Sequence, residues 1–227
     1  MSVPSPIYVF DAFGTLFDVH SAAREHAAVL GDKAARVSEI WRAKQLEYTW
    51  IYARIDQSRG FVMPPFREVT RLSVHYALAV CGLEASLAPQ LLESYQRLAP
   101  FAEVPATLRR LKDGGAKLAI LSNADTDMLD DLVVNASLDG VFDNLISARA
   151  AGTFKPSPSV YALATEVYNC EPAAITFLSS NRWDVAGAKA FGFKTIWINR
   201  SGLPDEYPDL PADQTLPDLG NLVRDMP

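Results

Sequence analysis

The chain has 227 residues, 49% of them hydrophobic, and a formal net charge of −6. Such a length can bury one sizeable core, or a core with a smaller subdomain, and the mild acidity gives no electrostatic reason to expect nucleic acid as a partner. Cys81 and Cys170 are too few and too widely spaced for a disulfide framework or a zinc site, and no apolar run approaches the roughly 18 residues of a membrane span, so we expect a cytoplasmic protein without a membrane partner.

Short apolar runs alternate with helical patterns along most of the chain. Ile7–Phe10 is predicted to be a strand buried on both faces, because it is apolar throughout rather than alternating. Similar runs predict further strands at Lys117–Ser122, Asn144–Ala148, Ile175–Ser179 and Lys194–Asn199. Helical patterns lie at Val104–Asp113, Thr126–Asn135, Ser157–Tyr168 and Asp184–Phe191. This order predicts an α/β protein with a doubly wound, Rossmann-like parallel sheet.

Residues 18–98 break the alternation, because they contain no convincing strand. Helix-like stretches lie at Ser21–Leu30, Val37–Asp56, Pro65–Cys81 and Pro89–Leu98. An insert after the first strand lies over the carboxyl ends of the strands, where open α/β sheets bind ligands. We therefore predict an α/β core of residues 1–17 and 99–227 and a helical cap of residues 18–98. Residues 201–219 are rich in Pro and Asp, and disorder is expected there.

Polar residues follow several of the predicted strands. Asp11 follows the first strand, Ser122 and Asn123 end the next, Lys155 lies in the loop after the weakest one, and residues 179–184 follow another. Because parallel strands end at the same edge of a sheet, these loops bring an acid, a hydroxyl–amide pair, a lysine and a second acid together. The convergence is a stronger indication of a site than any single motif.

These segments resemble the four motifs of the haloacid dehalogenase superfamily. They read DAFGTLF, LSNA, the Lys-Pro pair at Lys155, and SSNRWDVAGAKAFGF. The helical segment WRAKQLEYTW resembles the cap signature of the L-2-haloacid dehalogenase branch. The resemblance extends from Tyr8 to about Asn199 and implies a hydrolase acting on carbon–halide bonds.

The branch within the superfamily depends on the residues around the nucleophile. Phosphatases of this superfamily carry a second Asp two positions after the nucleophile, where this chain has Phe13, and the last motif has neutral Ser179 and Asn181 before Asp184. Few carboxylates remain for Mg²⁺, a hard cation that needs several oxygen ligands. A departing halide needs neither a proton nor a metal, so we expect no metal and no organic cofactor.

The resemblance implies a two-step reaction on Asp11. Its carboxylate displaces the halide of a small L-2-haloacid with inversion, forming an ester. Arg42 and Asn123 hold the halide product. A water activated by Asp184 then hydrolyses the ester to the D-2-hydroxyacid.

The remaining site residues are also implied by the resemblance. Donors for the substrate carboxylate are Ser122, Lys155 and backbone amides after Asp11, beginning at Ala12. Phe13, Leu46, Phe61 and Trp183 wall the alkyl side and exclude water. Supporting catalytic positions are Thr15, Tyr161, Ser179 and Asn181. Homodimers are usual in this branch, and the aromatic cap could support one.

Alternatives remain open at this point. Asp11 and Asp184 could simply cap helices, Arg42 could be a solvated helix residue, and Lys155 a turn lysine. Thr15, Tyr161 and Ser179 are equally compatible with purely structural roles. For the whole protein, the rivals are a magnesium-dependent phosphatase, a fluoroacetate-preferring dehalogenase and a non-catalytic binding module.

Overall fold

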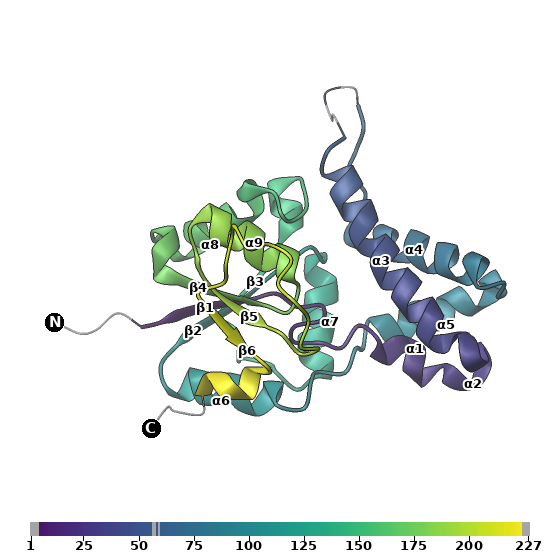
Figure 1. Ribbon diagram of the computed structural model, residues 1–227, viewed down its shortest axis with the longest axis horizontal. Helices are drawn as coiled ribbons and strands as arrows, with labels where there is room; N and C mark the ends of the chain where they lie inside the picture. Colours follow the sequence, from purple (N-terminus) through teal and green to yellow (C-terminus); the bar gives the residue numbers. More distant parts are fainter. Residues whose placement is uncertain (1–4, 56–57, 59, 224–227) are drawn as a thin grey trace.

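The computed structural model describes residues 5–55, 58 and 60–223. Its centre is a six-stranded sheet in the order β3-β2-β1-β4-β5-β6, and every neighbouring pair is parallel (Figure 1). The strands are β1 (Ile7–Phe10), β2 (Lys117–Ser122), β3 (Asn144–Ser147), β4 (Ile175–Ser179), β5 (Lys194–Ile198) and β6 (Gln214–Leu216). The predicted doubly wound α/β sheet is therefore confirmed, and β1 lies where the strand order reverses, the position at which such sheets bind ligands.

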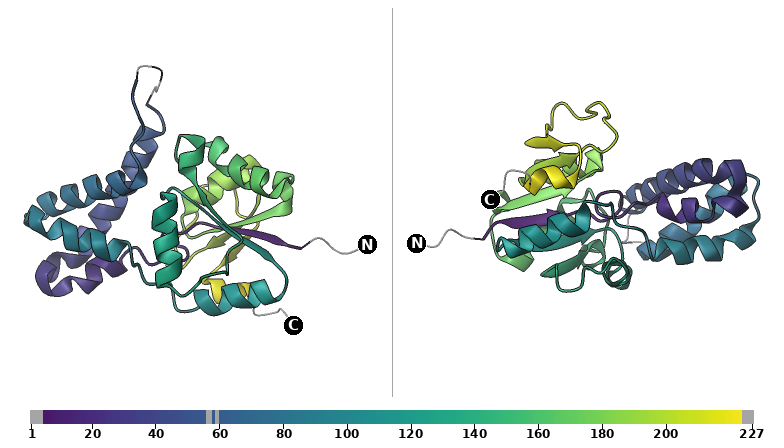
Figure 2. Two further views of the ribbon diagram at one scale, coloured as in Figure 1. Left: turned by 180° about the vertical axis from the view of Figure 1, so that it is seen from behind. Right: turned by 90° about the horizontal axis from the view of Figure 1, so that it is seen from below.

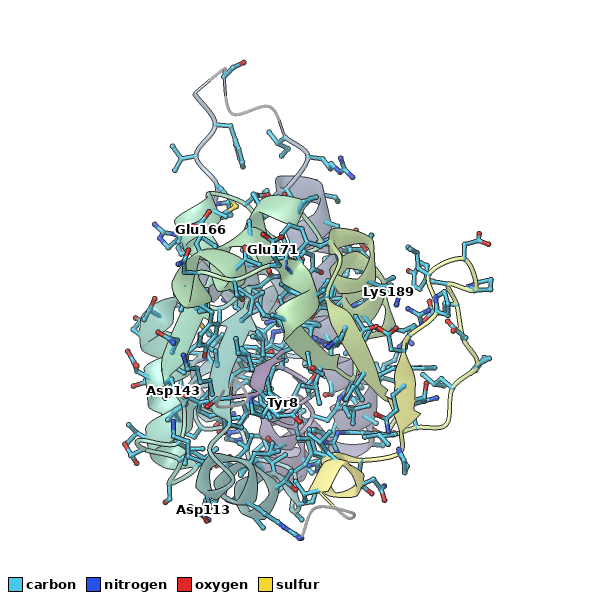
Figure 3. The ribbon with its side chains drawn as sticks, turned by 90° about the vertical axis from the view of Figure 1, so that its left-hand side faces the viewer. Tyr8, Asp113, Asp143, Glu166, Glu171 and Lys189 are labelled. Carbon is cyan, nitrogen blue, oxygen red and sulfur yellow. The ribbon has the colours of Figure 1, made fainter. Side chains whose placement is uncertain are left out.

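Both faces of the sheet are buried, which explains why its strands read as continuous apolar runs. Phe10 and Leu178 belong to one core cluster, and Val9 and Phe177 belong to a second. Helices α6 and α7 cover the first face, and α8 and α9 cover the second; Figure 3 views this arrangement from the end opposite the cap, with Tyr8 of β1 near the centre. The helices are α6 (Val104–Asp113), α7 (Thr126–Asn135), α8 (Pro158–Tyr168) and α9 (Arg182–Phe191). All four predicted core helices are confirmed within two residues at each end.

The region between β1 and α6 is helical, as predicted. Its helices are α1 (Ser21–Glu25), α2 (Ala27–Leu30), α3 (Ala34–Tyr52), α4 (Phe66–Val80) and α5 (Ala88–Tyr95). They lie together to one side of the sheet in both views of Figure 2. The single helix predicted at Ser21–Leu30 is broken at His26, whose ring bonds Ser94 Oγ of α5 at 2.8 Å. The second predicted helix, Val37–Asp56, corresponds to α3, which begins three residues earlier and ends at Tyr52, and residues 53–55 form turns and a bend; Asp56 itself lies outside the described residues.

Two backbone segments join these helices to the sheet, and they run side by side. The backbone N–H of Asp18 donates to the carbonyl of Ala99 at 2.9 Å, and that of Phe101 donates to Leu16 at 3.0 Å. The outgoing and returning chains are thereby tied to each other where they leave the sheet.

The expectation of disorder at residues 201–219 is wrong. Buried Arg182 of α9 donates to the carbonyls of Tyr207 and Leu210 at 2.8 and 2.7 Å. Asp213 accepts the backbone N–H of Thr195 at 2.8 Å, and the following residues add β6 to the sheet. Long-range hydrogen bonds hold a segment whose composition alone suggests disorder. Short 3₁₀ helices complete the chain at Gly31–Lys33, Ala85–Leu87, Ala148–Ala151, Pro172–Ala174 and Leu219–Val223.

Candidate active site

Asp11 lies directly after β1, between the ends of β2 and β4. Its backbone N–H donates to the carbonyl of Leu178 at 2.9 Å, so the sheet pairing continues up to the carboxylate. Oδ2 accepts hydrogen bonds from Thr15 Oγ1 and Asn181 Nδ2, both at 2.8 Å. The turn that brings Thr15 back depends on Gly14, whose φ of +86° is a left-handed conformation that favours glycine. The Gly-Thr pair of the first motif therefore holds the carboxylate in place.

Lys155 lies between two carboxylates. Its Nζ is 3.2 Å from Asp11 Oδ1 and 2.8 Å from Asp184 Oδ2, and its side chain is only 1% exposed. Its backbone N–H donates to Asn123 Oδ1 at 2.8 Å, which ties the loop after β3 to the end of β2. A buried ammonium needs such partners, because an unpaired charge would be strongly destabilising.

Asp184 is fully buried near the start of α9. Tyr161 donates its hydroxyl to Asp184 Oδ1 at 2.7 Å, while Lys155 holds the other oxygen. Burial raises the pKa of Asp184 to about 6, and the negative charge of Asp11 adds to the rise, although Lys155 and the Tyr161 hydroxyl favour the ionised form. Burial also raises the pKa of Tyr161 well above its ordinary value, which keeps it a hydrogen-bond donor. A carboxyl that titrates near neutrality is suited to accept a proton.

Gly187 is a site residue that the sequence reasoning missed. A Cβ at this position of α9 would lie 2.5 Å from the Tyr161 hydroxyl and 2.8 Å from Pro156 Cβ. The helix can approach the Tyr161 hydroxyl this closely only because residue 187 has no side chain. The signal in the sequence is a glycine inside a helix, where it is otherwise unfavourable.

The loop after β4 closes the site against the loop after β1. Thr15 Oγ1 donates to Asp11 and accepts the backbone N–H of Ser180 at 2.8 Å, so one hydroxyl links the two loops. Ser179 Oγ accepts the backbone N–H of Asn181 at 3.1 Å and lies 3.4 Å from Asp11 Oδ2.

Arg42 extends from α3 to the loops of the sheet. Its Nη2 donates to the Phe13 carbonyl and to Asn181 Oδ1, each at 3.1 Å. Among the residues that the structure describes, Arg42 forms no ion pair. Its positive charge is therefore held at the site by neutral acceptors and remains available to an anion.

Ser122 and Asn123, the predicted hydroxyl–amide pair, are buried, and so is Ala12, the first residue after Asp11. Ser122 Oγ accepts the backbone N–H of Ala124 at 3.2 Å, and Asn123 supports Lys155 as described above. Ala12 is fully buried, and its carbonyl accepts backbone hydrogen bonds within its own loop.

The four residues predicted to wall the substrate's alkyl side have different surroundings among the described residues. Phe13 is buried and stacks on Tyr95, with ring centroids 5.5 Å apart. Leu46 lines a cavity of about 450 Å³ that also contains Arg42 and Asn181.

Trp183 and Phe61 lie elsewhere. Trp183 lines a separate cavity of about 680 Å³ and packs edge-on against Trp50 at the end of α3. Phe61 stacks on Tyr52 with a centroid distance of 5.8 Å. Trp183 and Phe61 thus pack against aromatic rings of α3, and their part in walling the alkyl side stays a prediction.

Two further residues were also missed by sequence reasoning. Arg200 donates to the Thr15 carbonyl at 2.8 Å and pairs with Glu103 at 2.6 Å. Gln45 accepts a hydrogen bond from Arg42 at 2.9 Å. No motif marks either residue. The Arg200 contacts join segments far apart in the chain, and the i,i+3 spacing of Arg42 and Gln45 on α3 does not by itself show that their side chains meet.

The described part of the chain contains no group of three or more His, Cys, Asp or Glu side chains placed to hold a metal ion. None of its helices is both long and apolar enough to cross a lipid bilayer.

Asp11 is buried at the switch point of a doubly wound sheet, and Lys155 bridges it to a second aspartate, Asp184. This arrangement defines an α/β protein whose candidate nucleophile is a carboxylate. The sequence profile of the haloacid dehalogenase-like hydrolases matches residues 6–192. The chain therefore belongs to this hydrolase family, as its motifs indicated.

Relatives share both sequence and fold along nearly the whole chain. Haloacetate dehalogenase H-2 of Moraxella sp. (strain B) is 40% identical over 218 residues, 95% of each chain. An (S)-2-haloacid dehalogenase of Pseudomonas sp. (strain YL) is 41% identical over 195 residues, 85% of this chain and 82% of its own. The L-2-haloacid dehalogenase of Xanthobacter autotrophicus with chloropropionic acid covalently bound is 36% identical, covers 99% of this chain and 100% of its own, and superposes with a TM-score of 0.82.

Proposed function

We propose that this protein hydrolyses short L-2-haloacids to D-2-hydroxyacids and halide, through an ester on Asp11 and with inversion at the α carbon. The observation that carries the proposal is the Asp11–Lys155–Asp184 chain, in which one ammonium joins a candidate nucleophile to a candidate base. The (S)-2-haloacid dehalogenase relatives and the covalently bound chloropropionic acid in the Xanthobacter structure support the same chemistry.

In the first step, a carboxylate oxygen of Asp11 attacks the α carbon, and the halide leaves with the bonding electrons. Oδ2 accepts from Thr15 and Asn181, whereas Oδ1 accepts only from Lys155 among the described residues. Oδ1 therefore has the freer lone pair and is the better placed oxygen to attack. Burial strips water from the carboxylate, which favours displacement at carbon.

The leaving halide needs a positive donor, and the cap supplies Arg42. Arg42 is joined to the core through neutral acceptors, so its charge is not cancelled. The proposal also assigns Asn123 to the halide, while Ser122, Lys155 and the amides from Ala12 onward hold the substrate carboxylate. Phe13 and Leu46 line the alkyl side, with Phe61 and Trp183 farther out.

In the second step, a water attacks the carbonyl carbon of the Asp11 ester, and the hydroxyacid leaves as the acyl bond breaks. Asp184 accepts the water proton, a role that fits its raised pKa, and this proton passes to the hydroxyacid oxygen as the acyl C–O bond breaks. Tyr161 and Lys155 orient Asp184. Thr15, Ser179 and Asn181 stabilise the negative charge that develops on the Asp11 oxygen during hydrolysis.

We also propose that the reaction needs no metal or organic cofactor. The Lys155 ammonium occupies the space between Asp11 and Asp184, where it is paired with both carboxylates. Phe13 stands where a phosphatase would carry its second acid. A magnesium-dependent phosphatase is the competing activity, and it requires the opposite response to a chelator.

The proposed domain division is a core of residues 1–17 and 99–227 and a cap of residues 18–98. The paired backbones of Asp18 and Ala99 support a boundary there. We further propose a homodimer, because Trp50, Ile51 and Val62 expose apolar side chains near the end of α3. Light scattering after gel filtration should then give twice the chain mass. A cytoplasmic location stays a prediction from the sequence.

The decisive experiment measures halide release from the separate enantiomers of 2-chloropropionate in the presence of EDTA. Wild type should act on the L enantiomer alone, and Asp11→Asn should lower the rate by about four orders of magnitude or more. The exposed Asp130→Asn variant on α7 is the matched control and should retain wild-type activity.

Other outcomes favour the rivals. Magnesium-dependent hydrolysis of a phosphate ester without halide release would favour the phosphatase. Release from fluoroacetate in preference to 2-chloropropionate would favour the narrower dehalogenase, an arm included because one relative is named a haloacetate dehalogenase. If neither halide release nor phosphate hydrolysis is detected, the non-catalytic binding module is the remaining hypothesis.

A further inference from the structure

Gln45 lies three residues after Arg42 on α3 and is completely buried. Its Oε1 accepts hydrogen bonds from Arg42 Nη1 at 2.9 Å and from the Tyr95 hydroxyl at 3.0 Å. Its Nε2 donates to Thr70 Oγ1 at 2.8 Å. One amide thus connects Arg42 of α3 to side chains of α4 and α5.

The orientation of this amide is determined by Thr70. Thr70 Oγ1 donates its single proton to the Phe66 carbonyl at 2.9 Å, so only its lone pairs face Gln45. The amide therefore turns its NH₂ group toward Thr70 and its carbonyl toward Arg42 and Tyr95. Arg42 meets a neutral acceptor of fixed direction.

The residues around the amide are themselves held. Tyr95 lies between Phe13 and Trp41, with ring centroids 5.5 and 4.8 Å away, and Trp41 Nε1 donates to the Thr70 carbonyl at 3.1 Å. Packing on this scale restricts the rotation of the Gln45 partners.

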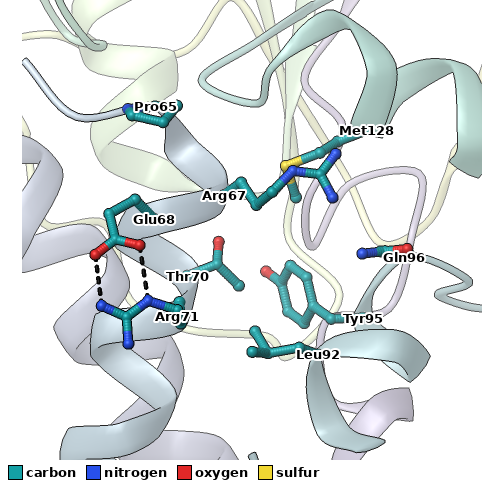
Figure 4. Close-up of a pocket in the computed structure, with 9 residues that line it drawn as sticks. All are labelled: Pro65, Arg67, Glu68, Thr70, Arg71, Leu92, Tyr95, Gln96 and Met128. Carbon is teal, nitrogen blue, oxygen red and sulfur yellow. Dashed lines mark hydrogen bonds and ion pairs between the residues drawn. The ribbon is translucent and has the colours of Figure 1, made fainter. Parts of the chain in front are cut away.

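Figure 4 shows Thr70 and Tyr95 side by side at a cavity of about 290 Å³ between α4 and α5. The acid nearest to them in this view, Glu68, is turned toward Arg71, which it meets through two hydrogen bonds of 2.6 and 2.7 Å. Glu68 is thus paired with another arginine, and the acceptor that Arg42 Nη1 meets within the cap is the neutral amide of Gln45.

We propose that Gln45 is a positioning residue that directs the Arg42 guanidinium toward the departing halide without cancelling its charge. The inference rests on the proposed dehalogenase function. A carboxylate at position 45 would pair with Arg42 and weaken its hold on the halide. An apolar side chain would leave Nη1 without its buried partner and free the guanidinium to turn.

The test compares Gln45→Glu and Gln45→Met with wild type on L-2-chloropropionate and L-2-bromopropionate. Both variants should lower kcat for the chloro substrate by about tenfold or more while KM changes by less than about threefold. The loss should be smaller for the bromo substrate, because bromide departs more readily and needs less help. Gln96→Glu at the end of α5 is the matched control, with no expected change in either rate.

A double-mutant cycle separates positioning from general packing. If Gln45 acts through Arg42, the effects of Gln45→Met and Arg42→Lys will not add. Additive effects, or equal losses on both substrates, would overturn the proposal. If Gln45→Glu fails to fold, Gln45→Met and Thr70→Val carry the same comparison.

The wild type and Arg42→Lys distinguish the two levels of the proposal. Halide release that depends on Arg42 but not on Gln45 would overturn the positioning role alone. A wild type that releases no halide would overturn the proposed function and this inference with it.

Discussion

The loops of the sheet and the cap helices hold their charged side chains in opposite ways. In the core, Asp11 after β1 and Asp184 at the start of α9 share the ammonium of Lys155, which lies in the loop after β3. In the cap, Arg42 is held by the uncharged Gln45. The three core groups thus carry one more negative than positive charge, and Arg42 forms no ion pair among the described residues.

This difference separates the two steps of the proposed reaction. A nucleophile and a proton acceptor need fixed surroundings and a shared counter-ion, because an unpaired buried charge would be costly. A group that receives a departing anion stabilises it more strongly when its own charge is not already paired. Changes in the core should therefore affect ester formation and hydrolysis, and changes in the cap should affect halide departure.

After Asp11→Asn, the largest effect is expected for Asp184→Asn. Loss of the proton acceptor should slow turnover by about a thousandfold, while attack by Asp11 continues, so the ester should accumulate. Intact-protein mass spectrometry after mixing with L-2-chloropropionate should detect one added propionate group. The exposed Asp139→Asn variant serves as the control. A slow variant without the adduct would place Asp184 in the first step instead.

A smaller loss, about a hundredfold in kcat, is expected for Arg42→Lys. Lysine keeps the charge but lacks the planar fork, in which Nη2 reaches the Phe13 carbonyl and Asn181 while Nη1 reaches Gln45. Arg36→Lys, which alters an exposed arginine near the start of α3, is the matched control and should behave as wild type. Stopped-flow halide detection would localise the loss. An unchanged rate of halide release would show that Arg42 does not assist halide departure.

The pH profile should bend near the raised pKa of Asp184, about 6. Below this value Asp184 is protonated and cannot accept a proton, so kcat should fall about tenfold per pH unit. The free energy of unfolding depends on pH in the opposite direction. The folded state binds this proton more tightly than the unfolded chain, so the contribution of Asp184 to stability is present at low pH and lost as pH rises through about 6. Urea unfolding of wild type and Asp184→Asn across this pH range would measure this contribution. If the two free energies of unfolding change with pH in parallel, the prediction is contradicted.

The smallest effect is expected for Arg67→Ala. Arg67 of α4 pairs with Asp127 of α7 at 2.6 Å, but the two side chains are 46% and 67% exposed. Solvent screens such a pair, so its loss should reduce the free energy of unfolding by less than about 1 kcal/mol. Turnover should stay within about twofold. A large loss of activity would mean that this contact between cap and core takes part in catalysis.

Much of the fold follows from local patterns. The apolar strands from Ile7–Phe10 to Lys194–Ile198 and the four core helices are readable, because burial on both faces leaves a strong signal. β6 at Gln214–Leu216 is not, because three residues with an exposed beginning carry little pattern. It exists through hydrogen bonds that Asp213 and Asn199 make across the edge of the sheet.

The sequence by itself determined which residues carry charge at the strand ends, because Asp11, Lys155 and Asp184 follow apolar runs whose parallel pairing brings them to one edge. Only the tertiary structure decided how they are joined. The bridging of two acids by Lys155, the closeness of Gly187 to Tyr161 and the acceptor that Gln45 turns toward Arg42 depend on distances between segments far apart or on side-chain direction. Such distances are set by packing, which no local pattern encodes.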